Sequence, residues 1–171
     1  DQGIGLPKWK PANYTKKFYG PSPMRLGIEK SRNLMTARLA LLVTMKKIKL
    51  YAKKFGINDD LPSLLSMSLG AGETTLLKLT SGYGMIVNGG KKIIPSFIDR
   101  VQDRRGNTIF KTDSRSCDLC NFNKNIDEKK IPNIQDSREE VTDPGSAYQM
   151  VSMLRGAVTT GTGRLVNKLN K

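Results

Sequence analysis

The sequence predicts an α+β protein that consists mostly of a helical lobe, with one β-hairpin and one long polar loop. Apolar residues recur at helical spacing after positions 34, 74 and 143. The pattern changes to two short strand-like runs between positions 93 and 112, and residues 113–140 contain almost no large apolar side chains. With 171 residues, 37% of them apolar, the chain has the size of one domain or of a large part of a bigger one.

Residues 1–30 are expected to be extended and irregular. Prolines and glycines are frequent there, and the aromatic residues Trp9, Tyr14, Phe18 and Tyr19 stand between the prolines without a helical period. We expect burial of these aromatic rings to pin the segment onto the rest of the protein.

A helical pattern begins at Leu34 and ends at Gly56, a residue suited to the position just after a helix. The pattern predicts either one helix or two helices with a break near Thr44. One apolar stripe runs along it, and most of the lysines lie off this stripe. The stripe consists of Leu34, Leu41, Met45, Ile48, Ala52 and Phe55.

The middle of the chain alternates between loops and regular elements. We expect a loop at 61–73, a helix from Thr74 to Val87 that is closed by Asn88-Gly89-Gly90, and a hairpin whose strands lie in "PSFIDRVQD" and "NTIFKT". Residues 113–140 are predicted to form a mobile loop.

The last predicted helix has strong signals at both ends. Asp143 is a good N-cap and Pro144 fits the first helical position. The Met and Leu residues of "YQMVSMLRGAV" are expected in the core. Residues 159–163, Thr-Thr-Gly-Thr-Gly, end the helix.

The net charge is strongly positive, because 29 Lys and Arg residues oppose 15 Asp and Glu residues, which gives +14. The basic residues are mostly lysines in pairs spread along the chain, without a base-reading motif. We therefore expect a solvated basic surface and no nucleic-acid partner. Because no apolar stretch approaches the roughly 20 residues that cross a bilayer, the segment is expected to be soluble, and its start at Asp1 suggests an excised piece.

The chain has no histidine, which excludes Ser-His-Asp and Cys-His catalysis and removes the commonest zinc ligand. Cys117 and Cys120 form a lone C-x-x-C pair, and a zinc site would need ligands from a second chain. In an oxidising compartment a disulfide is the more natural state of this pair. We expect no metal and no cofactor.

A serine nucleophile without histidine needs a lysine one helical turn away, as in Ser-x-x-Lys. No serine of this chain has a lysine three residues later. Three residues after Ser22 and Ser152 the chain has Arg25 and Arg155 instead. A guanidinium is too basic to accept the proton. The sequence therefore predicts that the chain has no nucleophile and base of this kind of its own.

Ser31-Arg32-Asn33 is the only Ser-x-Asn sequence in the chain. Ser and Asn are preferred helix caps, so by composition alone this triplet predicts a cap for the helix that starts near Leu34. The alternative is that the triplet belongs to an active site.

Four long stretches favour the active-site alternative. They are "WKPANYTKKFYGPSPMRLGIEKSRNLMTARLA" (9–40), "KKFGI" (53–57), "SLGAGETTLLKLTSGYGMIVNGGKKIIPSFIDRVQDRRGNTIF" (68–110) and "VTDPGSAYQMVSMLRGAVTTGTG" (141–163). In these stretches the sequence resembles the transpeptidase domain of class A penicillin-binding proteins. Residues 1–171 are thus expected to be part of a transpeptidase domain with the fold that these proteins share with serine β-lactamases.

The resemblance implies a wall synthase, anchored at the periplasmic face of the bacterial inner membrane, that also carries a glycosyltransferase. Its transpeptidase domain cross-links peptidoglycan stem peptides through an acyl-enzyme and is acylated by β-lactams. Three motifs meet in its cleft: Ser-x-x-Lys, Ser-x-Asn and Lys-Thr-Gly. Only the second is present here, so the chain is expected to lie between the other two and to be inactive alone.

The resemblance also implies roles for individual residues. Ser31 would relay a proton to the leaving amine, and Asn33 would orient the acyl-donor peptide. Trp9 and Tyr14 are expected to border the substrate cleft, and Gly161 and Gly163 to let a substrate backbone approach closely.

Two further expectations stand beside these roles. With its sheet missing, the isolated chain should expose core surfaces and associate with itself. The alternative function is that of a non-catalytic basic module that binds an anionic membrane or a cell-wall polymer.

Overall fold

The computed structural model describes residues 8–115 and 134–169, which divide between two compact units. The first unit comprises residues 1–93 and 140–171, and the second comprises residues 94–139. The described elements are α1 (Met24–Glu29), α2 (Asn33–Val43), α3 (Met45–Lys54), the 3-10 helix η1 (Leu65–Leu69), α4 (Leu76–Val87), β1 (Arg100–Gln102), β2 (Thr108–Lys111), α5 (Pro144–Thr159) and the 3-10 helix η2 (Arg164–Leu169). The predicted α+β class is confirmed.

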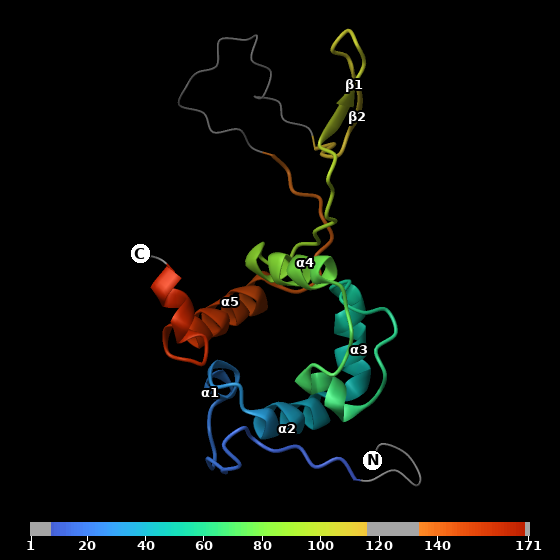
Figure 1. Ribbon diagram of the computed structural model, residues 1–171. Coiled ribbons are helices and arrows are strands. Elements are labelled where there is room, and N and C mark those ends of the chain that lie inside the picture. Colours follow the sequence, from blue (N-terminus) through green and yellow to red (C-terminus); the bar gives the residue numbers. More distant parts are fainter. Residues whose placement is uncertain (1–7, 116–133, 170–171) are drawn as a thin grey trace. The chain divides into compact units, whose positions relative to one another are not determined.

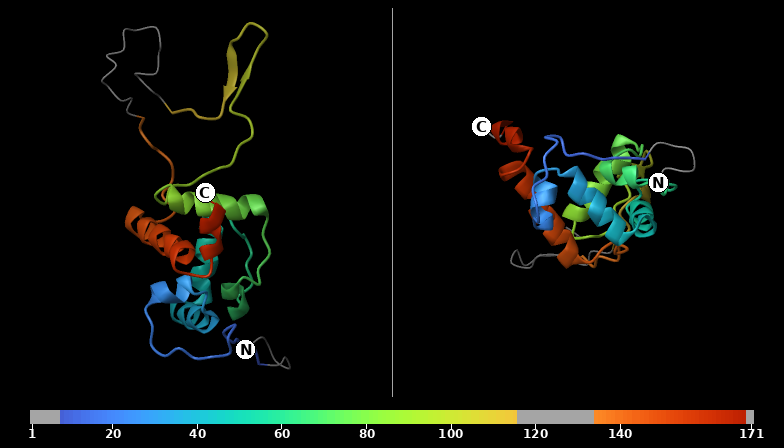
Figure 2. Two further views of the ribbon diagram at one scale, coloured as in Figure 1. Left: turned by 60° about the vertical axis from the view of Figure 1, so that its left-hand side comes forward. Right: turned by 90° about the horizontal axis from the view of Figure 1, so that it is seen from below.

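Five helices and the two 3-10 segments make up the described part of the first unit. Helix α1 packs against both α2 and α5, α4 packs against α5, and α2 contacts α3 and η1 (Figure 1). The views of Figure 2 show α1 and α5 side by side from two further directions. The buried apolar residues are mostly small or unbranched: Ala37, Ala40, Leu61, Met85, Val141, Ala147 and Met153.

The long helical pattern after Leu34 forms two helices, α2 and α3, which meet at Thr44. Thr44 has a φ of 73°, a value that a β-branched residue rarely adopts and that breaks the helical path. Helix α3 ends at the predicted place, with Gly56 just after its C-cap at a φ of 63°. The predicted apolar stripe is wrong in part. Leu41 is 65% exposed, and the buried side of α2 is formed by two alanines.

The two later helices, α4 and α5, begin close to the positions predicted for their N-termini. Thr75 caps α4 by accepting a hydrogen bond from the Lys78 amide at 3.2 Å. The Asp143 carboxylate caps α5 by accepting the Ser146 amide at 2.8 Å. Hydrogen bonds from Ser146 lower the pKa of the Asp143 carboxyl, which is expected for a carboxylate at a helix N-terminus. The core prediction for this helix holds for Met153, which is buried.

The prediction that residues 1–30 are irregular is wrong at the end of this range, where α1 forms a helix of 6 residues after Pro23. Burial of the aromatic rings is also not observed for Tyr14 and Phe18, which are 98% and 80% exposed. Hydrogen bonds hold this segment instead, and one of them is donated by the buried side chain of Asn13 to the Lys17 carbonyl. The loop predicted at 61–73 contains η1.

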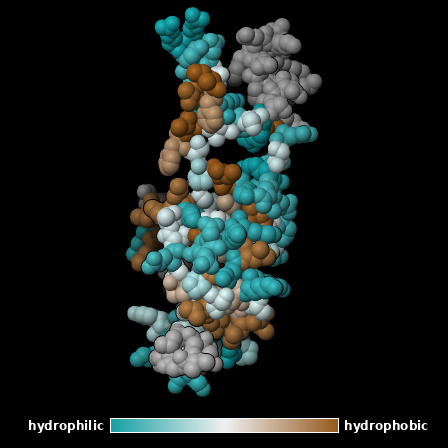
Figure 3. Space-filling model, turned by 90° about the vertical axis from the view of Figure 1, so that its right-hand side faces the viewer, coloured by the Kyte–Doolittle hydropathy of each residue, from teal (hydrophilic) through white to brown (hydrophobic). Residues whose placement is uncertain are grey.

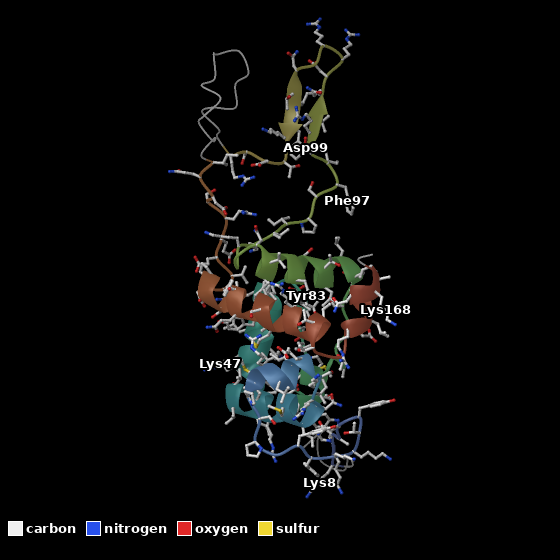
Figure 4. All side chains as sticks on the ribbon, turned by 90° about the vertical axis from the view of Figure 1, so that its left-hand side faces the viewer. Lys8, Lys47, Tyr83, Phe97, Asp99 and Lys168 are labelled. Atoms are coloured by element: carbon white, nitrogen blue, oxygen red, sulfur yellow. The ribbon has the colours of Figure 1, made fainter. Side chains whose placement is uncertain are left out.

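The second unit contains the predicted hairpin, with β1 and β2 antiparallel and an irregular register next to Gln102. Its turn is organised by Asp103, whose Oδ1 accepts the amides of Arg105 at 2.8 Å and Asn107 at 2.9 Å. The Asn107 side chain donates to Oδ2 of the same residue at 2.8 Å and contributes most to lowering the pKa of this carboxyl. Phe97, which precedes β1, is 93% exposed (Figure 4).

The predicted loop at 113–140 falls mostly outside the described residues, and so do Cys117 and Cys120. Within the described ranges, no helix is both long and apolar enough to cross a membrane. Large apolar side chains are nevertheless exposed on both units, among them Leu42, Leu76 and Ile94 at 80–82%. Figure 3 shows apolar surface between hydrophilic residues on one face.

Candidate active site

The Ser-x-Asn triplet forms the tight connection between α1 and α2. Helix α1 ends in a Schellman motif: the Ser31 amide donates to the Ile28 carbonyl at 3.0 Å and the Arg32 amide donates to the Gly27 carbonyl at 2.9 Å. Ser31 takes the left-handed position of this motif with a φ of 51°. Its side chain is therefore displayed at a sharp corner, and the residue is exposed.

The same motif ends two other helices of this unit, which makes Ser31 unusual by comparison. After α3 the left-handed residue is Gly56, and after α4 it is Gly89. Glycine is the usual choice because it has no Cβ to clash in this conformation, whereas other residues lose roughly 1 kcal/mol. A serine at this position costs stability, and strain of this kind is common at functional sites.

Neither Ser31 nor Asn33 caps the following helix, so the cap prediction is wrong. Helix α2 begins at Asn33 itself, and its N-cap residue Arg32 makes no side-chain capping bond. The cap comes from a residue 21 positions earlier in the sequence: Oδ1 of Asn13 accepts a hydrogen bond from the Leu34 amide at 3.2 Å. In return, Nδ2 of Asn33 donates to the Ala12 carbonyl at 2.9 Å.

This reciprocal pair joins two of the predicted site segments. The Asn33 amide is held by its nitrogen, while its Oδ1 has no hydrogen-bond partner among the residues that the structure describes. Asn13 also donates from Nδ2 to the Lys17 carbonyl at 2.8 Å, which closes the segment on itself. Sequence reasoning missed Asn13, because nothing local marks a cap that lies 21 residues from the helix it serves.

Arg32 contacts the 18–22 segment. Its guanidinium lies 3.9 Å from the centre of the Tyr19 ring and donates to Oγ of Ser22 at 3.1 Å. Arg32, Tyr19 and Ser22 are among the residues that line an open, mostly apolar cavity of about 580 Å³ beside α1 and α2. The middle residue of the triplet thus anchors the 18–22 segment and leaves the corner to its two neighbours.

The 160–163 segment lies directly against the end of α1. The Thr162 amide donates to the Glu29 carbonyl at 3.1 Å, and a Cβ at Gly161 would lie 2.2 Å from the same oxygen. Gly163 turns the chain back onto α5, with its amide 2.9 Å from the Ala157 carbonyl. The structure therefore brings Gly161 close to the Ser31 corner, and only glycine fits there.

A basic hollow opens beside this contact, with a volume of about 540 Å³. Lys30, Arg164 and Lys168 line it together with Gly161 and Thr162.

Of the predicted cleft aromatics, Trp9 is half-buried, whereas Tyr14 projects into solvent. In the described ranges no cluster of three or more His, Cys, Asp or Glu residues could hold a metal ion.

The fold and these motifs together define a class of protein. Residues 2–171 match the family described as "Penicillin binding protein transpeptidase domain". The chain belongs to this family.

The chain is most usefully compared with penicillin-binding protein 1A. It is 46% identical to the protein of that name from Rickettsia bellii and 44% identical to that of Rickettsia conorii, with 99% of this chain and 22% of each relative covered. The chain thus spans about a fifth of the length of these relatives.

Solved structures show the same fold. Penicillin-binding protein 1A from Haemophilus influenzae matches with a TM-score of 0.74 and 24% identity, over 95% of this chain and 26% of that one. The D,D-transpeptidase domain of a peptidoglycan glycosyltransferase from Eggerthella lenta matches with a TM-score of 0.65 and 19% identity, over 89% of this chain and 40% of that one. The family match and the identity to the rickettsial relatives, and not the fold alone, favour a part of a transpeptidase domain over a basic binding module.

Proposed function

We propose that this chain contributes the Ser-x-Asn part of a peptidoglycan D,D-transpeptidase, a serine enzyme that cross-links stem peptides and is acylated by β-lactams. The observation that carries the proposal is the exposed Ser31 corner, in a chain of this family, packed against the 160–163 segment. Ser-x-x-Lys and Lys-Thr-Gly are absent from the 171 residues, so the nucleophile and the third motif are supplied from outside them.

Each of the two motif residues has a chemical task in this proposal. The nucleophilic serine of Ser-x-x-Lys attacks the carbonyl carbon of the penultimate D-alanine, the peptide bond to the terminal D-alanine breaks, and the leaving amine takes up a proton. The Ser31 hydroxyl passes on this proton, because a hydroxyl can accept one and donate another. The Asn33 amide orients the acyl-donor peptide without adding charge, and its uncommitted Oδ1 supports this role.

The context of the enzyme follows from the family resemblance and is part of the proposal. The complete protein is a membrane-anchored wall synthase at the periplasmic face of the inner membrane, with a glycosyltransferase elsewhere in its sequence. In this proposal Trp9, Tyr14, Gly161 and Gly163 border the cleft. Residues 1–171 form part of the transpeptidase domain.

The test is acylation by a fluorescent penicillin. A protein that carries residues 1–171 with its natural flanking sequence is labelled, and both Ser31→Ala and Asn33→Ala reduce the acylation rate, the former by roughly 10²-fold. Ser63→Ala, at an exposed serine of the 61–73 segment, is the matched control and keeps the wild-type rate. Wild-type labelling of Ser31→Ala would refute the proposal.

A second measurement addresses the chain alone. Intact-mass analysis of residues 1–171 after incubation with penicillin is expected to show no added mass. A covalent adduct on any serine would contradict the proposed division of the motifs.

A further inference from the structure

Glu29, two residues before Ser31, has a buried carboxylate that joins two helices. The residue is only 8% exposed. Its Oε2 accepts a hydrogen bond from the Thr160 hydroxyl at 3.0 Å, and its Oε1 lies 3.4 Å from Nη1 of Arg25. Arg25 in turn donates from Nη2 to Oγ of Ser152 at 3.1 Å. Helix α1 is therefore tied to α5 at two points by one carboxylate and its arginine.

The backbone repeats this connection at the same place. The Glu29 carbonyl accepts the Thr162 amide, and Nζ of Lys30 donates to the Thr160 carbonyl. Beside Gly156 there is no space between α5 and the carboxylate for a side chain, since a Cβ at Gly156 would lie 1.9 Å from Oε1. Figure 4 shows α5 next to α1, the two helices that these contacts join.

We propose that Glu29 is a positioning residue that fixes the Ser31–Asn33 corner against the 160–163 segment. This inference rests on the proposed function, because the corner matters only if Ser31 serves the reaction. Its geometry is independent of that function: the buried carboxylate of the last residue of α1 contacts Thr160 at the end of α5.

The physical argument concerns the charge and the short distance to Ser31. A buried carboxylate is tolerated only when its oxygens are hydrogen-bonded or paired. Glu29 is the last residue of α1 and lies inside the Schellman motif from Gly27 to Arg32, which leaves Ser31 little freedom of its own. Movement of Glu29 relative to Thr160 therefore carries Ser31 with it, and small displacements of catalytic groups reduce rates strongly.

The test measures acylation by a penicillin in the protein with its natural flanking sequence, and separates the noncovalent dissociation constant from the first-order acylation rate. Glu29→Ala is expected to lower the acylation rate roughly tenfold with little change in the dissociation constant. Glu29→Gln keeps an acceptor for Thr160 and restores part of the rate. Thr160→Val keeps the side-chain size, removes the hydroxyl and lowers the rate in the same way.

The matched controls are Glu73→Ala and Glu73→Gln, at an exposed glutamate of the same unit, and both keep the wild-type rate. All variants are measured at a temperature at which circular dichroism shows them folded. A residue that only stabilised the fold would lower the melting temperature and leave the acylation rate of the folded protein unchanged. That result for Glu29→Ala and Thr160→Val overturns the inference.

A double variant tests the direct contact. Gly156→Ala places its Cβ against the carboxylate and is expected to slow acylation, whereas Gly156→Ala combined with Glu29→Ala is expected to match Glu29→Ala alone. Additive effects would contradict the contact. Failure of the proposed function looks different, because wild-type protein would then not be labelled, or Ser31→Ala would be labelled at the full rate.

Discussion

The side-chain carbonyl of Asn13 caps helix α2 by accepting the Leu34 amide at 3.2 Å. The cap and the Asn33 bond to Ala12 fasten the N-terminal segment to the helix that follows the Ser31 corner. A local sequence motif is thus completed by a residue from outside it. The position of Asn33 depends on this contact.

Replacement of Asn13 tests the cap. Asn13→Ala is expected to lower the free energy of unfolding by about 1 kcal/mol, the usual cost of losing a helix cap. Asn13→Asp keeps the acceptor oxygen and should lose less, since it gives up only the donor to Lys17. Thermal unfolding followed by circular dichroism measures both changes. Equal melting temperatures for wild type and Asn13→Ala would show that the cap contributes nothing.

Ser31→Gly separates stability from activity. Glycine removes the left-handed strain, so this variant is expected to be more stable than wild type by up to about 1 kcal/mol. Ser31→Ala keeps the strain and should gain nothing. Both variants lose the hydroxyl and should acylate roughly 10²-fold more slowly. The idea fails if glycine lowers the melting temperature, or if either variant keeps the wild-type acylation rate.

The Asp143 cap predicts a defined pH dependence. The folded state lowers the pKa of this carboxyl below its ordinary value of 3.8. The carboxylate therefore stabilises the fold fully at pH values above the pKa that Asp143 has in the unfolded state. This stabilisation declines as the pH falls through the lower pKa of the folded state. Asp143→Ala should lower the melting temperature at pH 7 and have a smaller effect near pH 3. Asp99→Ala, at an exposed carboxylate that contacts its neighbour Arg100, is the control for removal of a carboxylate that does not cap a helix.

Exposed apolar surface predicts self-association of residues 1–171 when they are produced alone. Leu42 and Leu76 of the first unit are 82% and 81% exposed. Analytical ultracentrifugation is expected to show dimers or larger species that increase with concentration. The matched double variant Leu42→Gln, Leu76→Gln should shift the distribution toward monomer. A monodisperse wild-type monomer with a high melting temperature would contradict this expectation.

The sequence predicted those features whose signals are local. The start of α5 at Asp143 follows from neighbouring residues, and the structure confirms it. For the helical pattern after Leu34 the sequence left one helix or two open, and the structure shows two that meet at Thr44. The hairpin also followed from a change of period and a glycine turn. Helix α1 was missed because it is six residues long and follows a segment rich in proline, which leaves no periodic pattern to detect.

The candidate site was predicted only in outline, because its contacts join distant parts of the chain. The Ser31-Arg32-Asn33 triplet was found through the resemblance of the surrounding sequence. Its support by Asn13 and by the Glu29–Thr160 bond spans 21 and 131 residues, and no spacing rule relates such positions. The roles of Ser31 and Asn33 stay predictions until the acylation rates are measured.

The backbone contacts between Gly90 and Val141 have a consequence for the evolution of this chain. The Val141 amide donates to the Gly90 carbonyl at 2.8 Å, and Lys91 forms a bridge with Glu140. The chain therefore leaves the helical unit and re-enters it at adjacent points that are already joined. Insertions, deletions or a complete exchange of residues 94–139 for a short turn need not disturb the helices around Ser31, so this is where related proteins can differ most in length.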